Sequence, residues 1–280
     1  MRMNKESSMR GPEYLESQVG ILKTRMGACF PGSHATFRGH NLHTELQDRS
    51  WLELYLFGIT GRRFSVVQLK LLEAIWIYTS YPDARIWNNR VAALAGTLQS
   101  TGSLGVSAAL SVSEAAIYGH QIMVRAGEFF ELIKKQMDSG ESATNCVLKE
   151  LKRSRNLAGY GRPINSTDER IDPILQRAHE LKLDSGSYLA LAFHVADILA
   201  EKRLRLKINY AAVAAALVLD TGINARELYF FVVPSFLAGI PPCYIEAERN
   251  PLASTFPISS SHVSYCGANK RRWTNGNGNG

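Results

Sequence analysis

The sequence predicts an all-α protein, and three features support this fold class. Apolar residues recur at helical spacing in most segments between residues 44 and 237. No run of alternating apolar and polar residues is long enough to predict a β-sheet core. Hydrophobic residues make up 45% of the 280 residues, which is enough for a sizeable core. We therefore expect helices packed on helices.

The predicted helices follow the apolar pattern and end at glycine, proline or polar residues. They span about residues 44–57, 65–80, 142–154, 185–204, 210–219 and 225–237, with a further helix that Ser166, Thr167 or Asp168 caps and that reaches Leu181. Gly58 and Gly61 are predicted to stop the first helix. Residues 91–118 are rich in Ala, Ser and Gly, which predicts closely packed helices at the domain centre or a subunit interface.

The chain divides into three parts by composition. Residues 1–35 contain Gly-Pro and Pro-Gly steps and no sustained periodicity, which predicts a loosely held N-terminal arm for docking or dimer contact. Residues 36–273 form the predicted helical domain. Residues 274–280 include an Asn-Gly repeat at 275–280 and predict a disordered tail.

The charge balance predicts an anionic partner. Lys and Arg number 32 against 25 Asp and Glu, a formal net charge of +7. This suits a phosphate-bearing cofactor or a polycarboxylate. Nucleic acid is not expected, because no reading-helix, RNA-sheet or zinc-finger signature accompanies the charge.

The cysteines and the N-terminus favour a cytoplasmic protein. Cys29, Cys146, Cys243 and Cys266 lie far apart and have no His at metal-ligand spacing, so we expect neither a disulfide framework nor a metal site. Charges precede any apolar run at the N-terminus, which argues against a secretory signal.

One stretch, residues 228–245, is nearly uncharged. It contains three prolines and barely reaches the length of a bilayer span. We expect a buried helix that ends at the Pro241–Pro242 pair, and no membrane partner.

Five segments in order resemble the citrate synthase superfamily in its short form, the size of citryl-CoA lyases. The segments are FRGHNLHTELQDRSWLELYLFGITGRR (37–63), RIWNNRVAALAGTLQSTGSLGVSAALSV (85–112), GYGRPINSTDER (159–170), NYAAVAAALVLDTGI (209–223) and YCGANKRRW (265–273). They are similar to the family's "RG-dl" turn, its Arg-containing small-residue helices, its "GxGHP" loop with "DPR", its "NVD" and its "YxGPxxRxY" ending. The resemblance covers residues 36–273 and implies a citrate synthase-like multi-helical fold and a homodimer.

The resemblance also implies a chemistry whose usual residues are replaced here. In the family a carboxylate removes the α-proton of an acyl-CoA thioester, one His stabilises the enolate oxygen and a second polarises a keto carbonyl. The family's "HGGAxE" His falls at Ile122 or Met123, with His120 nearby but out of register. Arg162 replaces the "GxGHP" His, and Ala211 replaces the Asp of "NVD". Arg162 and His120 are therefore the candidate catalytic residues.

Four further residues are candidate substrate-binding groups by resemblance. Arg170 matches the "DPR" arginine that grips a substrate carboxylate, and its planar fork suits that task. Gly161 belongs to the same loop, and Asn209 begins the tripeptide that replaces "NVD". Arg90 is either structural or meets CoA phosphates. The family's later carboxylate-binding Arg falls near Ser235 or Phe236 and is absent.

Simpler roles compete with these assignments. Arg162 could form a salt bridge with Asp168 or Glu169, and His120 could be a satisfied histidine at a helix edge. Glu114, Asp168 and Glu246 are candidates for a relocated base, although surface or cap roles compete for each.

Two hypotheses about function follow. The first is a divergent enzyme that uses a coenzyme A thioester and a carboxylate substrate to make or break a carbon–carbon or acyl bond. The second is a non-catalytic binding or regulatory subunit that keeps the fold and the anion pocket.

Overall fold

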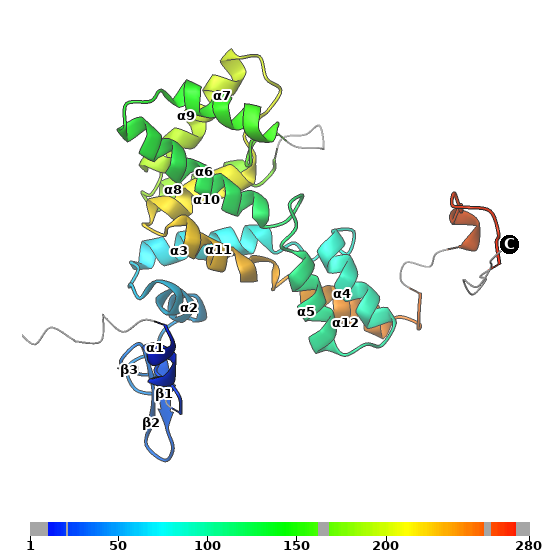
Figure 1. The fold of residues 1–280 in the computed structure, drawn as a ribbon, viewed down its shortest axis with the longest axis horizontal. Helices are drawn as coiled ribbons and strands as arrows, with labels where there is room; N and C mark the ends of the chain where they lie inside the picture. The colour runs from blue at the N-terminus through cyan, green and yellow to red at the C-terminus, as the bar shows by residue number, and fades with distance from the viewer. Residues whose placement is uncertain (1–10, 21, 162–167, 255–258, 273–280) are drawn as a thin grey trace, which may run out of the picture. The chain divides into compact units, whose positions relative to one another are not determined.

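The computed structural model describes residues 11–20, 22–161, 168–254 and 259–272 (Figure 1). Its elements are α1 (Pro12–Glu16), β1 (Gly27–Phe30), β2 (His34–Phe37), β3 (His40–Asn41), α2 (Trp51–Thr60), α3 (Val66–Thr79), α4 (Trp87–Thr97), α5 (Gly102–Val112), α6 (Gln121–Asp138), α7 (Ala143–Ser154), α8 (Ile171–Glu180), α9 (Ser187–Glu201), α10 (Tyr210–Asp220), α11 (Ala225–Val232), the 3-10 helix η2 (Val233–Phe236), α12 (Ile240–Arg249) and the 3-10 helix η3 (Ser260–His262). The predicted mainly helical fold is confirmed.

The chain forms two compact units. The first unit contains Met1–Tyr81 and Leu110–Ala238, and the second contains Pro82–Ala109 and Gly239–Gly280. Each unit is therefore built from two separate stretches of sequence. The division at residues 35 and 273 that composition predicts is a different one, and it stays a prediction.

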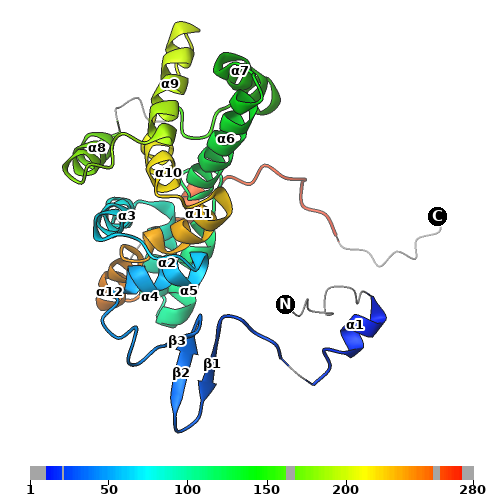
Figure 2. The same cartoon turned by 90° about the vertical axis from the view of Figure 1, so that its left-hand side faces the viewer.

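Helix α10 lies at the centre of the first unit. Residues 212–219 of this helix are all buried, and six of the eight are alanine or valine. Small side chains all round a helix let neighbours approach from every side. Helices α6 and α9 pack against it, as the two views show (Figures 1 and 2).

Helices α2, α3 and α11 form a second layer of this unit. The Trp76 indole on α3 stacks on Phe231 and donates a hydrogen bond to its backbone carbonyl at 2.9 Å. Tyr55 on α2 donates to the Phe230 carbonyl at 2.7 Å. The predicted helix 65–80 is confirmed, since Ser65 caps it with Gln68 in a capping box and Ser80 ends it.

The first predicted helix differs from α2 at both ends. Helix α2 begins at Trp51, because the Ser50 hydroxyl accepts the N–H of Glu53 and caps the first turn there. It continues through Gly58 and ends at Gly61, which has a left-handed φ of 70°. A Cβ on Gly58 would come within 2.8 Å of the Phe37 ring. Gly58 therefore makes room for Phe37 and does not stop the helix.

The second unit explains the small-residue region. Helices α4 and α12 pack together, and a Cβ on Gly96 would lie 2.3 Å from the carbonyl oxygen of Tyr244. A Cβ on Gly105 of α5 would lie 2.8 Å from the Cβ of Ala95. Close backbone approach requires glycine at both positions.

The predicted arm contains regular structure that the sequence pattern did not predict. Strands β1, β2 and β3 form an antiparallel sheet, with Gly27 opposite Phe37 and Thr36 opposite Asn41. The Arg38 guanidinium holds the sheet to α2 through two hydrogen bonds to the Gly58 carbonyl, at 3.0 and 2.8 Å. Strands of two to four residues are too short to show an alternating pattern.

The apolar stretch 228–245 is not one helix. Helix α11 leads into η2, and Pro241 and Pro242 lie in the first turn of α12. The prediction that a helix ends at this pair was wrong, because proline lacks an N–H and fits the first turn, where no partner is needed. The stretch Ala225–Arg249 could cross a membrane by length and composition, and 44% of its most apolar window is buried.

Adjacent residues on α6 test this packing. Ile133 is fully buried, whereas the Leu132 side chain next to it is 45% exposed. We expect Ile133→Ala to lower the free energy of unfolding by about 3 kcal/mol because it leaves a core cavity. Leu132→Ala should change it by less than about 1 kcal/mol. Urea unfolding followed by circular dichroism measures both, and equal losses would contradict the burial of this face.

Candidate functional site

The glycine-rich loop lies against the N-terminus of α10. The Gly161 N–H donates to the Lys207 carbonyl at 2.6 Å, and the Asn209 N–H donates to the Gly159 carbonyl at 2.9 Å. The Asn209 side-chain amide donates to the Gly161 carbonyl at 2.9 Å. The structure therefore brings Gly161 and Asn209 together, although 48 residues separate them in the chain.

The conformation of this loop requires its glycines. Gly159 and Gly161 have φ angles of 84° and 86°. A Cβ on Gly159 would also lie 2.6 Å from the Cβ of Ala212. Between them the buried Tyr160 donates its hydroxyl to the Ala192 carbonyl at 2.7 Å. This part of the loop is fixed to α9 and α10.

Arg170 forms a two-pronged ion pair with Asp168. Its Nε and Nη2 lie 2.8 and 2.9 Å from the two carboxylate oxygens. The Asp168 side chain is only 3% exposed, and that of Arg170 is 25% exposed. The guanidinium also lies 4.4 Å from the centre of the Tyr210 ring and 5.9 Å from that of Tyr81. The predicted carboxylate-gripping arginine is thus already paired with a carboxylate of its own chain.

Asp168 also holds the start of α10. Its Oδ2 accepts the N–H of Tyr210, the first residue of that helix, at 3.1 Å. Burial raises the pKa of Asp168, but the hydrogen bond and charge of Arg170 outweigh this and bring the pKa below its usual value. Asp168 was predicted as a possible cap of α8, but Arg170 occupies that cap position. The Asp168 carboxylate instead accepts the N–H at the start of α10, which has no partner within its own helix.

Two predicted site residues are not placed beside this group. Arg162 lies outside the described residues, as do Ser166 and Thr167. Arg90 belongs to α4 in the second unit, where its Nη2 donates to the Arg85 carbonyl at 3.4 Å.

His120 lies in a second polar cluster, directly before α6. Its side chain is buried, the residue being 4% exposed, and neither ring nitrogen has a hydrogen-bond partner among the described residues. The ring packs edge-on against Tyr229 with 6.1 Å between centres. A buried polar group without a partner costs about 1–3 kcal/mol. This contradicts the simpler role of a satisfied histidine at a helix edge.

The protonation of His120 is set by burial. Burial lowers the pKa of the imidazole, against a smaller opposite effect of the Glu114 charge. The ring is therefore neutral near pH 7, and a neutral imidazole can donate one N–H and accept at the other nitrogen.

Glu114 is the carboxylate of this cluster. Its Oε1 accepts the Tyr229 hydroxyl and the Gln121 side-chain amide, each at 2.9 Å. Of the other two acids considered as a relocated base, Asp168 is paired with Arg170, and Glu246 is exposed on α12 in the second unit.

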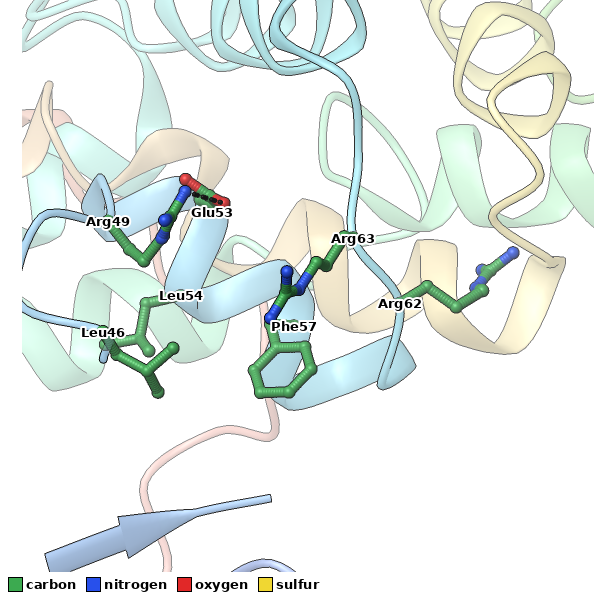
Figure 3. A pocket seen from close by; sticks show the side chains of 7 residues that line it. All are labelled: Leu46, Arg49, Glu53, Leu54, Phe57, Arg62 and Arg63. Carbon is green, nitrogen blue, oxygen red and sulfur yellow. Dashed lines mark hydrogen bonds and ion pairs between the residues drawn. The ribbon is translucent and has the colours of Figure 1, made fainter. Parts of the chain in front are cut away.

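Two cavities of the first unit are lined by residues other than Asp168, Arg170, Glu114 and His120. A small one of about 20 Å³ at α2, with room for little more than a water molecule, is lined by Leu46, Arg49, Glu53, Leu54, Phe57, Arg62 and Arg63. Figure 3 shows Arg49 paired with Glu53 at its edge. A second, open groove of about 410 Å³ lies between α3 and α8. No cluster of three or more metal-ligating side chains occurs in the part of the chain that is described.

Solved structures share this fold. A citryl-CoA lyase from Hydrogenobacter thermophilus has a TM-score of 0.77 at 19% identity, over 91% of this chain and 98% of its own. An ATP citrate lyase from Methanosaeta concilii in complex with (3S)-citryl-CoA has a TM-score of 0.69 at 13% identity, over 93% of this chain and 45% of its own. A citrate synthase from Thermoplasma acidophilum, in a ternary complex with carboxymethyl coenzyme A and oxaloacetate, has a TM-score of 0.61 at 16% identity, over 81% of this chain and 59% of its own.

The chain therefore has the citrate synthase-like fold, and the resemblance seen in the sequence is confirmed at the level of the fold. The sequence matches no family model and no curated protein.

The ion pair predicts a particular dependence of stability on pH. Because the pKa of Asp168 is lowered in the folded protein, its contribution is present at neutral pH and is lost as the pH falls below the ordinary aspartate value of 3.8. Asp168→Asn keeps an acceptor for Tyr210 but removes the charge. We expect it to lower the free energy of unfolding at pH 7 by about 3 kcal/mol. Denaturant unfolding across pH tests this, and a difference from wild type that persists in acid would contradict it.

Proposed function

We propose that this protein is a divergent citrate synthase-like enzyme that binds an acyl-CoA thioester beside a carboxylate substrate and makes or breaks a carbon–carbon bond. The observation that carries the proposal is the buried imidazole of His120, which lies in a citrate synthase-like fold without a hydrogen-bond partner among the described residues. Two of the similar structures hold citryl-CoA, or carboxymethyl coenzyme A with oxaloacetate. These ligands motivate the choice of substrate class.

His120 would act as the donor to the thioester oxygen. When the α-proton leaves, negative charge develops on that oxygen, and a pre-placed N–H stabilises it most in a dry site. The ring is neutral and precedes the 18-residue helix α6, whose N-terminus adds positive potential. A neutral imidazole keeps its N–H throughout, so no proton has to be replaced.

Arg170 would bind the carboxylate substrate. Asp168 uses Nε and Nη2 and leaves the Nη1 donors of the fork for a ligand. Since the pair is neutral overall, the binding energy comes from directed hydrogen bonds more than from net charge. In this proposal Arg162 supplies the second cation, and the hydrogen bond between Asn209 and Gly161 holds the described part of the glycine-rich loop at the start of α10.

A non-catalytic binding protein is the second candidate. It is favoured by Ala211, a methyl group at the place where the family carries its carboxylate base. Such a protein would bind thioester and acid without turnover. The homodimer and the cytoplasmic location stay predictions from the sequence in either case.

Proton exchange separates these candidates. Wild-type protein incubated with acetyl-CoA in D₂O, with and without oxaloacetate, should incorporate deuterium at the thioester α-carbon, as followed by mass spectrometry. His120→Asn should slow the exchange by about 100-fold, the usual effect of losing one donor to an oxyanion. Binding of acetyl-CoA in calorimetry without any exchange would support the binding protein and contradict the enzyme.

Carboxylate recognition is tested separately by citrate binding. Arg170→Gln should weaken binding about 10-fold to 100-fold, the value of one charge-assisted hydrogen-bonded contact of about 1.5–3 kcal/mol. Arg170→Lys keeps the charge but loses the planar fork, so its citrate affinity should lie between those of wild type and Arg170→Gln. Arg153→Gln on α7 removes an exposed arginine paired with Glu150 and serves as the control. Equal affinity for all four proteins would contradict the assignment, provided that each unfolds cooperatively.

A further inference from the structure

A carboxylate base is missing from the place where the family carries it. Residue 211 is alanine, and the Asn209 side chain accepts the Ala211 N–H at 3.0 Å as an ordinary helix cap. A methyl group cannot take a proton. If the proposed enolisation takes place, another residue must accept the α-proton.

Asp168 is unsuited to this task. Both of its oxygens are bound to Arg170, and one also accepts the Tyr210 N–H. Its carboxylate is stabilised as an anion and holds the start of α10. Proton uptake there would break the ion pair and leave Arg170 uncompensated.

Glu114 is oriented and accessible. Its Oε1 is held by the Tyr229 hydroxyl and the Gln121 amide, while no partner is recorded for Oε2 in the described parts of the chain. The residue is exposed, so substrate can reach it. The same tyrosine contacts both groups, since its hydroxyl binds the Glu114 carboxylate and its ring packs edge-on against His120.

We propose that Glu114 is the catalytic base of this protein, in place of the aspartate at the family's usual position. The inference rests on the proposed function. The α-C–H bond of the thioester breaks. Its proton goes to Oε2 of Glu114, and its electron pair forms the enolate, whose oxygen accepts a hydrogen bond from the N–H of His120. The enolate carbon then attacks the keto carbon of the second substrate, whose C=O π pair moves to the oxygen. That alkoxide takes a proton from a solvent water, and Glu114 returns its proton to solvent. In the lyase direction the same steps run in reverse.

Glu114→Gln tests this without disturbing the cluster. Glutamine keeps an oxygen that can accept from Tyr229 and Gln121, but it is not basic. With acetyl-CoA in D₂O we expect α-deuterium exchange to fall by at least about 100-fold, the usual contribution of a general base. Acetyl-CoA affinity measured by calorimetry should stay within about 2-fold of wild type. Glu246→Gln removes the other exposed candidate acid and should leave both quantities unchanged.

Chemical rescue separates catalysis from structure. Glu114→Ala leaves space beside Tyr229 and Gln121, and added formate or acetate should restore part of the exchange in proportion to its concentration. The same salts should not raise exchange by wild-type protein or by His120→Asn. A purely structural role for Glu114 would give no rescue.

The outcomes distinguish this inference from the proposed function. Wild-type exchange that survives in Glu114→Gln would overturn Glu114 as base and leave the enzyme proposal standing. Wild-type protein that binds acetyl-CoA but exchanges no α-proton would overturn both. Loss in Glu114→Gln together with rescue of Glu114→Ala by small carboxylates would support both.

Discussion

The Asp168 carboxylate is the interaction on which the arrangement of the site depends. One side chain, 3% exposed, neutralises Arg170 and binds the first N–H of α10. It therefore joins the segment that follows the glycine-rich loop to the most deeply buried helix of the first unit. The loop itself contacts the same helix end through Asn209. The arginine and the start of the helix are thus held by the same carboxylate.

The two polar clusters differ in whether their buried polar groups have partners. Around Arg170 every strong charge meets an opposite charge within hydrogen-bond distance, which makes burial tolerable. Around His120 a polar ring is buried with no partner recorded in the described structure. Proteins retain such groups mainly where something else has to bind them. That contrast is the physical basis on which we propose anion binding for the first cluster and chemistry for the second.

Helix periodicity and capping made most of the fold predictable. The pattern that predicted residues 65–80 and 142–154 matches α3 and α7 closely, because Ser65 and Ser142 cap them locally. The β-hairpin was missed, since its stability comes from Arg38 binding a carbonyl twenty residues away. For the site, the order of the motifs identified Gly161, Asn209 and Arg170 as candidates. It did not identify Asp168 as the partner of Arg170. The isolation of His120 is also a property of packing, because residues far apart in sequence surround it.

The division of the second unit into two stretches has a consequence for synthesis on the ribosome. Helix α4 packs against α12, whose first residue is number 240. All of residues 110–238, which belong to the first unit, are translated between α4 and α12. The glycine face that fits Tyr244 must wait for that partner, so α4 exposes an unpaired apolar surface on the nascent chain until α12 has been made.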